Sequence, residues 1–305
     1  MSDAILCECF ARDGLQHEPA FVPTATKRAL IERFAALGFA RIEATSYSNP
    51  KVVPQFADAS ELLRSLPRRA GTYYKATCAN PKAVERALAD LDAGYGVNEI
   101  SLLVSATEAH TQKNLNRTRA EQWANAEEMV RKTSGRFRMV GTVSVAFGCP
   151  FEGKVDPGVV AEDVARFVAL GVEHVVLGDT TGLATPKSVR EMVKRMPAGA
   201  TLVAHFHDTR GTGLVNYVAA YEAGIRFFDA SFGGVGGHPA KVKYGGGHTG
   251  NVCTEDLVSL FEAMGIGTGI DLDGLLAAAE HCEEVLGRQL YGRVTRSGLA
   301  QRNAD

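Results

Sequence analysis

The chain has 305 residues, with 33 Lys and Arg against 35 Asp and Glu, so no basic field favours nucleic acid as a partner. Its hydrophobic fraction of 45% is ordinary for a globular protein, and no stretch approaches the roughly 20 apolar residues that a membrane helix needs. Residues 1–7 lack the features of a signal peptide, and six cysteines in so long a chain do not suggest a disulfide scaffold. We therefore expect a reduced, cytoplasmic protein without a membrane partner.

Strand patterns and helix patterns alternate along the whole chain. Strands are expected at residues 4–10, 41–45, 72–78, 98–104, 137–145, 172–177, 201–206 and 226–230. Helices are expected at residues 24–37, 53–66, 81–92, 119–132, 159–170, 186–195 and 214–223, and again from residue 254.

Repeated strand–helix units without a break in composition favour an α/β fold in which a parallel sheet closes into a (β/α)8 TIM barrel. The segments that follow residue 254 then add C-terminal helices. Such a barrel commonly takes about 250 residues as one unit, so residues 1–305 are expected to form a single domain. A doubly wound open sheet is the alternative architecture.

In a (β/α)8 barrel the functional side chains gather where the strands end. Arg12 and Asp13 follow the first expected strand, Glu43 lies in the second, and Asp179 follows the sixth. Neighbours on a straight strand point to opposite faces, so Arg12 and Asp13 reach one site only if the chain bends there. A carboxylate such as Glu43 in an apolar strand is expected to be paired or functional. The alternative interpretations are a surface arginine for Arg12 and a helix cap for Asp179.

His205 and His207 carry the sharpest signal, because two residues at this spacing on a strand project from the same face. Paired imidazoles suit a divalent metal, although two hydrogen-bonded core histidines would have the same spacing. Asp13 could add a carboxylate and Asn251 a carbonyl oxygen. This mixed set, completed by water, suits Mg²⁺ or Mn²⁺, whereas zinc more often takes cysteine or a third histidine.

The segments that contain these residues resemble those of the hydroxymethylglutaryl-CoA lyase family. They occur in the same order over most of the chain, and their combination is far more specific than any one of them. The segments are ARDGLQ at 11–16, IEATS at 42–46, AFGCPFEGK at 146–154, LGDTTG at 177–182, HFHDT at 205–209, GN at 250–251 and TEDLV at 254–258.

The resemblance implies a homodimeric, metal-dependent barrel lyase that cleaves a 3-hydroxyacyl-CoA to acetyl-CoA and a keto acid. It implies that Mg²⁺ or Mn²⁺ is held by Asp13, His205, His207 and Asn251.

The resemblance also implies roles in proton transfer and charge stabilisation. Cleavage removes the proton of a carbinol hydroxyl and leaves an enolate with negative charge on the thioester oxygen. Arg12 is expected to stabilise that charge as a permanent cation. Asp179 or His205 is expected to take the hydroxyl proton, and Glu43 to take part in acid/base chemistry.

The sequence departs from the family at GGHP, residues 236–239, where the family has GGCP. His238 replaces the cysteine, and we expect it to act as the acid that protonates the enolate. The loop from His238 to Asn251 is longer than the family pattern, and Lys75 and Arg210 are additional cations. We expect the two cations to add positive charge near the barrel mouth, which would suit a substrate with an additional or differently placed carboxylate. Because these departures concern one site, we expect poor turnover of hydroxymethylglutaryl-CoA and preference for another acyl-CoA.

Other functions fit parts of the sequence. A condensing acyltransferase of the isopropylmalate-synthase type would join acetyl-CoA to a 2-oxo acid, but such chains usually carry a regulatory domain after the barrel. A pyruvate-type aldolase is a second relative, and a Schiff base on Lys75 would need no metal. A catalytically silent barrel that binds a CoA ester is the alternative outside catalysis, and it would need no general base.

Overall fold

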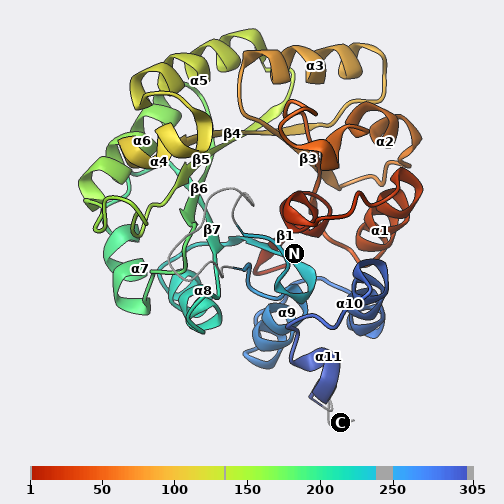
Figure 1. Cartoon of the computed structure of the whole chain (residues 1–305). Helices are drawn as coiled ribbons and strands as arrows, with labels where there is room; N and C mark the ends of the chain where they lie inside the picture. The colour runs from red at the N-terminus through yellow and green to blue at the C-terminus, as the bar shows by residue number, and fades with distance from the viewer. Residues whose placement is uncertain (1, 134, 238–249, 301–305) are drawn as a thin grey trace.

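The computed structural model describes residues 2–133, 135–237 and 250–300 (Figure 1). Within them the strands form a closed parallel barrel in chain order, with helices on its outer side. The last strand pairs with the first, which excludes the doubly wound open sheet. The prediction of a (β/α)8 barrel is therefore confirmed.

The strands and helices follow the alternation seen in the sequence. The strands are β1 (Ile5–Glu8), β2 (Arg41–Ser46), β3 (Tyr73–Cys78), β4 (Glu99–Ser105), β5 (Arg138–Ser144), β6 (His174–Asp179), β7 (Thr201–Phe206) and β8 (Phe227–Ala230). The helices are α1 (Thr24–Ala36), α2 (Ala59–Ser65), α3 (Pro81–Asp92), α4 (Glu108–Leu115), α5 (Arg119–Thr133), α6 (Pro157–Ala169), α7 (Pro186–Val193), α8 (Gly213–Glu222), α9 (Thr254–Ala263), α10 (Leu272–Leu286) and α11 (Val294–Ser297).

Two helical segments differ from the expectation. The segment expected as one helix at 53–66 is a 3₁₀ turn followed by α2, and the chain turns between them at Asp58, whose carboxylate binds Lys27 and Thr24 of α1. Helix α4 was not expected, because it buries only His110 and Thr111 and so has no apolar stripe to reveal it.

Several helix ends follow local sequence signals. Proline occupies the first turn of α3, where Oδ1 of Asn80 accepts a hydrogen bond from the backbone N–H of Ala83. Thr185 caps α7 through a reciprocal contact with Ser188. Gly171 follows the end of α6 with a φ of 80°, a left-handed conformation that glycine adopts without strain. These signals explain why the alternation of strands and helices could be predicted from the sequence.

The barrel interior is charged. The side chains of Arg41, Lys75, Glu99 and Asp229 are at most 3% exposed. They form ion pairs, with 2.8 Å between Arg41 and Glu99 and 3.4 Å between Lys75 and Asp229. Branched aliphatic side chains usually fill such barrels, and buried charges are tolerated only when they are paired. The interior is therefore a polar support beneath the carboxyl ends of the strands.

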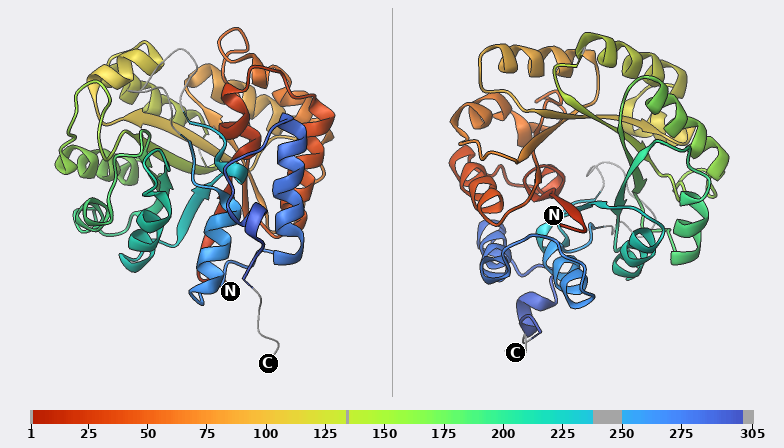
Figure 2. Two further views of the ribbon diagram at one scale, coloured as in Figure 1. Left: turned by 60° about the horizontal axis from the view of Figure 1, so that its bottom comes forward. Right: turned by 180° about the vertical axis from the view of Figure 1, so that it is seen from behind.

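The C-terminal helices complete the outer layer next to the first elements of the chain. Helix α10 lies beside α1, and α9 lies between α10 and α8 (Figures 1 and 2). Phe34 of α1 stacks on Phe232 after β8 with 5.2 Å between ring centroids. This contact joins the first and the last parts of the chain that form the barrel. No helix among the described residues is long and apolar enough to span a bilayer.

Candidate active site

The chain turns sharply just after β1, in the π-helical turn Phe10–Gly14. This turn brings two consecutive side chains to one place, so that Nη1 of Arg12 lies 2.7 Å from Oδ1 of Asp13. The bend required by the sequence prediction is present, and π-helical turns of this kind are frequent at functional sites. The side chain of Arg12 is only 15% exposed, so the alternative of a surface arginine is wrong.

The two histidines of β7 and its end converge. Nε2 of His205 lies 3.3 Å from Nε2 of His207. Two neighbouring ligands of an octahedral ion, each about 2.1 Å from it, would lie about 3.0 Å apart. The distance therefore suits two ligands of one cation, and it also suits a proton shared between the rings.

Asp13 and Asn251 favour the interpretation of the two histidines as ligands of one cation. Nδ2 of Asn251 donates to Oδ2 of Asp13 at 2.6 Å and to the carbonyl of Val235 at 3.0 Å. Oδ1 of Asn251 is buried and has no hydrogen-bond partner among the described residues. Candidate ligand atoms of Asp13, His205 and His207 all lie within 4.8 Å of one another. A buried carbonyl oxygen without a donor is costly, and a divalent cation would satisfy it, so the residues present fit a metal.

The charge state of Asp13 suits a metal ligand. Burial raises its pKa, but the neighbouring Arg12, His205 and His207 lower it more, and the net result lies well below the usual range. The carboxyl is therefore ionised at neutral pH, as metal binding requires.

Glu43 lies in β2 directly beneath Arg12. One of its oxygens is 2.6 Å from Nη2 of Arg12, and the other accepts a hydrogen bond from the hydroxyl of Thr77 at 2.7 Å. The side chain is 1% exposed. Glu43 is thus paired, as the sequence predicted, and its carboxylate fixes the orientation of the Arg12 guanidinium.

Asp179 ends β6 and is almost fully buried. Its two oxygens accept the backbone N–H groups of Leu183 at 2.8 Å and Ala184 at 3.1 Å. Burial raises its pKa to about 6, and the two N–H groups and the charge of Arg210 limit the rise. The expected alternative of a helix cap is wrong, because Thr185 caps the next helix. Asp179 instead orders the loop after β6.

Asp229 of β8, which was not among the residues predicted from the sequence, contacts His205. Nδ1 of His205 lies 3.6 Å from Oδ2 of Asp229, and the two residues face each other across neighbouring strands. Asp229 is a carboxylate in the apolar strand FFDA. The argument that singled out Glu43 would have singled out Asp229 as well.

Of the two additional cations, Lys75 does not lie where it was expected. Lys75 is 2% exposed inside the barrel, 3.4 Å from Asp229 and 3.7 Å from Glu43, so the expectation that it adds charge at the barrel mouth is wrong. Arg210 is exposed on the loop after β7, and its Nη1 donates to the carbonyls of Thr181 and Gly182. Of the two cations, only Arg210 is accessible near the mouth.

His238, the expected replacement for the family cysteine, lies outside the described residues. The same holds for most of the loop that follows it, up to residue 249. Its role as the acid stays a prediction.

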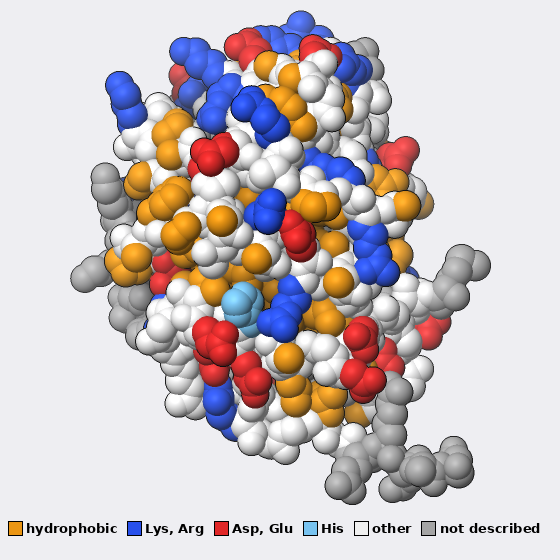
Figure 3. Space-filling view, turned by 90° about the vertical axis from the view of Figure 1, so that its right-hand side faces the viewer, with side chains coloured by type: hydrophobic (Ala, Val, Ile, Leu, Met, Phe, Trp, Pro, Cys, Tyr) orange, Lys and Arg blue, Asp and Glu red, His pale blue; other side chains and the backbone are white. Residues whose placement is uncertain are grey.

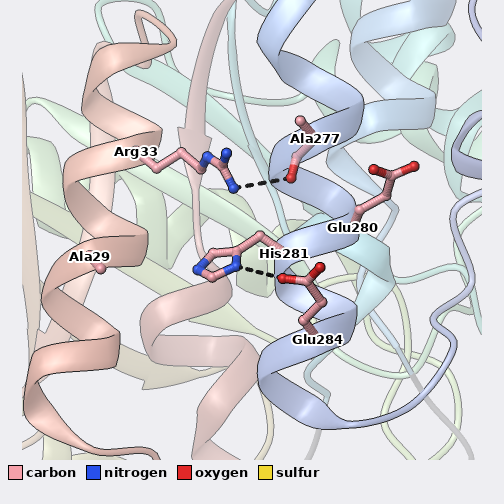
Figure 4. Close-up of a pocket in the computed structure, with 6 residues that line it drawn as sticks. All are labelled: Ala29, Arg33, Ala277, Glu280, His281 and Glu284. Atoms are coloured by element: carbon pink, nitrogen blue, oxygen red, sulfur yellow. Dashed lines mark hydrogen bonds and ion pairs between the residues drawn. The ribbon is translucent and has the colours of Figure 1, made fainter.

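Two hollows occur on the outer side of the barrel, one between α1 and α10 and one between the loop at residues 18–23 and the end of α10. The first, about 550 Å³, contains the hydrogen bond from Arg33 to the carbonyl of Ala277 and the contact between His281 and Glu284 (Figure 4). Figure 3 shows this side of the molecule, where charges of both signs alternate with small apolar areas. None of the candidate site residues lines either hollow.

Comparison with known proteins gives a consistent result. Residues 3–282 match the family model described as HMGL-like. The mitochondrial hydroxymethylglutaryl-CoA lyase of Macaca fascicularis is 36% identical over 96% of this chain and 88% of its own length. The (R)-citramalyl-CoA lyase of Chloroflexus aurantiacus is also 36% identical, over 98% of this chain and 96% of its own.

A solved structure extends the match to three dimensions. The hydroxymethylglutaryl-CoA lyase of Acinetobacter baumannii, in complex with coenzyme A and 3-methylmalate, superposes with a TM-score of 0.91. It is 38% identical, and the match covers 99% of this chain and 96% of that one. More distant barrels, such as the carboxyl transferase domain of Rhizobium etli pyruvate carboxylase at 16% identity, share the fold alone. The chain therefore belongs to the HMGL-like family and is a carbon–carbon lyase.

Proposed function

We propose that this lyase uses a divalent metal to cleave a 3-hydroxyacyl-CoA between its carbinol carbon and its α-carbon. The observation that carries the proposal is the convergence of Asp13, His205 and His207 near the unsatisfied Oδ1 of Asn251, beside the guanidinium of Arg12. In the reaction a base takes the hydroxyl proton, the carbinol becomes a carbonyl, and the electron pair of the broken bond passes to the thioester as an enolate. Protonation of the α-carbon completes the acyl-CoA product.

We propose Mg²⁺ or Mn²⁺ as the metal, because the four residues offer two imidazole nitrogens, one carboxylate and one amide oxygen, and no thiolate. When bound, such an ion lowers the pKa of a hydroxyl and fixes its orientation. Asp13, His205, His207 and Asn251 would hold it and leave coordination positions open.

Arg12 is proposed to stabilise the enolate. Its guanidinium is always charged and offers donors in a fixed plane, and Glu43 holds it from below at 2.6 Å. In this proposal Glu43 is a positioning residue, because its carboxylate is ion-paired with Arg12 at 2.6 Å, whereas the oxygens of Asp179 accept neutral backbone N–H groups.

Proton transfer is assigned to Asp179 and His238. Asp179 has a pKa raised to about 6, so it is mainly ionised at pH 7 and can still accept a proton. His238 is proposed to protonate the α-carbon, since an imidazolium titrates near neutral pH. His205 is the alternative base.

For the acyl group we propose a carboxylate on the carbinol carbon, as in citramalyl-CoA. Hydroxymethylglutaryl-CoA instead carries its carboxylate one carbon further away. The relative named for citramalyl-CoA is as similar as one named for hydroxymethylglutaryl-CoA, and the A. baumannii structure holds 3-methylmalate, a 2-hydroxy acid. The accessible cation Arg210 adds support, because a guanidinium binds carboxylates well. The products would be a 2-oxo acid and an acyl-CoA.

We further propose that residues 1–305 act as one barrel domain, as a homodimer in the cytoplasm. The described cysteines are all free and buried, which suits a reducing compartment. Sedimentation of the purified protein tests the dimer.

The function is tested by incubating the chelator-treated enzyme with hydroxymethylglutaryl-CoA, citramalyl-CoA and 3-methylmalyl-CoA, each with and without Mn²⁺ or Mg²⁺. Release of acyl-CoA and keto acid is followed by chromatography. We expect cleavage only with metal, and fastest cleavage of a substrate whose carboxylate lies on the carbinol carbon. Cleavage at an unchanged rate in chelator would overturn the metal proposal.

A further inference from the structure

His205 has two different neighbours on its two ring nitrogens. Nε2 faces Nε2 of His207 at 3.3 Å, and a ring nitrogen of His205 lies within 4.8 Å of ligand atoms of Asp13 and His207. Nδ1 faces Oδ2 of Asp229 at 3.6 Å. His205 and Asp229 are directly opposed in the register of β7 and β8, so this arrangement comes from the sheet itself and not from a loop.

Asp229 is held from several directions. Nη1 of Arg41 lies 3.3 Å from its Oδ1, and Nζ of Lys75 lies 3.4 Å from its Oδ2. The hydroxyl of Tyr217 donates to its backbone carbonyl. Arg41 is in turn fixed by Glu99 at 2.8 Å. The side chain of Asp229 is 3% exposed, so its carboxylate is a fixed charge inside the barrel.

The two cations keep Asp229 ionised. Arg41 and Lys75 place one cationic nitrogen beside each of its oxygens, at 3.3 and 3.4 Å, and buried cations this close stabilise the charged form of a carboxylate. An ionised carboxylate beside Nδ1 accepts a hydrogen bond and does not donate one. The proton on the ring is therefore drawn to Nδ1, which leaves a lone pair on Nε2.

We propose that Asp229 is a positioning residue of the metal centre, which holds His205 in the tautomer with a proton on Nδ1 and a free lone pair on Nε2. The inference rests on the proposed metal dependence. Histidines that bind metals almost always donate their other ring N–H to a carboxylate or a carbonyl, and loss of that partner commonly weakens metal binding about 10–100-fold. Lys75, which departs from the family pattern, is in this proposal the counter-charge that keeps Asp229 in position.

A purely structural role is the competing explanation, in which Asp229 only neutralises Arg41 and Lys75. It predicts lower stability after substitution but unchanged affinity for the metal. The affinity for the metal, measured on folded protein, therefore distinguishes the two explanations.

The experiment measures Mn²⁺ affinity by titration calorimetry for the parent and for Asp229→Asn, which keeps the side-chain shape. Asp163→Asn is the matched control. Asp163 is also a buried aspartate and lies 2.9 Å from Arg119, but it belongs to α6, outside the barrel interior. We expect the dissociation constant to rise about 10–100-fold for Asp229→Asn and to stay unchanged for the control. We also expect high Mn²⁺ to restore much of the activity of Asp229→Asn.

Equal affinity of the parent and Asp229→Asn would overturn the inference while leaving the metal site intact. No binding by the parent would instead overturn the proposed function. If Asp229→Asn does not fold, ¹⁵N-histidine NMR of the parent protein shows which ring nitrogen of His205 carries the proton. The His205 signals are assigned by their loss in His205→Gln. A proton on Nδ1 of His205 supports the inference, and a proton on Nε2 contradicts it.

Discussion

Nη2 of Arg12 lies 2.6 Å from Oε2 of Glu43, so a carboxylate from β2 holds the cation that follows β1. The guanidinium also touches Asp13, and neither carboxylate is open to solvent. Burial lowers the pKa of Arg12, but Glu43 and Asp13 raise it more, and the net result is above its usual range. The arginine is thus a fixed cation whose removal would leave two buried carboxylates with less compensation.

Substitution Arg12→Met is expected to lower kcat by about 10²–10³-fold, the loss typical of one donor to a developing oxyanion. The melting temperature of the metal-free protein should fall, because Glu43 and Asp13 lose their partner. Saturating Mn²⁺ should recover part of that loss through Asp13. Arg12→Lys is the control, and it should restore stability better than kcat, since an ammonium lacks the planar donors. A normal kcat for Arg12→Met would refute the catalytic role.

Substitution His207→Ala is expected to weaken Mn²⁺ binding strongly, because it removes one of two converging imidazoles. The measurement is metal content after chelator treatment and reloading. His174→Gln is a matched control, since His174 is also a largely buried histidine of the barrel but pairs with Val140 at the start of its strand. Parent-like metal content in His207→Ala would show that the assignment is wrong.

The pH dependence of kcat/KM should reflect Asp179 if it is the base. A base must be unprotonated, and its pKa is raised to about 6, so kcat/KM should rise with pH up to about 6 and then level off. In Asp179→Asn this acidic limb should disappear along with most of the activity. A limb that persists in Asp179→Asn would assign the base to another group, with His205 as the next candidate.

Lys75 is not expected to form a Schiff base. Burial lowers its pKa, but Asp229 and the other neighbouring anions raise it well above its ordinary value, so the amine stays protonated and is not nucleophilic. Treatment with borohydride in the presence of substrate or 2-oxo acid should leave the mass of the protein unchanged. A reduced adduct on the peptide that contains Lys75 would contradict this expectation.

Hydroxymethylglutaryl-CoA is expected to be a poor substrate, with kcat/KM below about 10⁴ M⁻¹s⁻¹, the lower end of the range for dedicated enzymes. The reason is the replacement of the family cysteine by His238 together with the longer loop. His238→Cys should increase turnover of this substrate if residue 238 supplies the acid. Parent activity at or above that value would sink the claim of altered specificity.

Part of the candidate active site could be predicted from the sequence. His205 and His207 could be paired because the two-residue period of a strand is local, and Arg12 with Asp13 because they are neighbours. Arg12 and Asp13 share one site because of the π-helical turn. The sequence argument needed a bend at this point, but nothing in the sequence predicted that the bend would form. Asp229 could have been noticed as a charge in a short apolar strand, but its partner could not, because that depends on which residues β7 and β8 place opposite each other.

The sequence by itself determined the alternation of strands and helices, and it determined which polar residues fall at the strand ends, because propensity, helix caps and side-chain period act over a few residues. Only the tertiary structure decided which distant groups meet. Asn251 reaches Asp13 across 238 positions, and Lys75 faces inward onto Asp229 and not outward to substrate. These contacts follow from closure of the barrel and the stagger of its strands, which are set by the packing of the whole chain and leave no local signal in it.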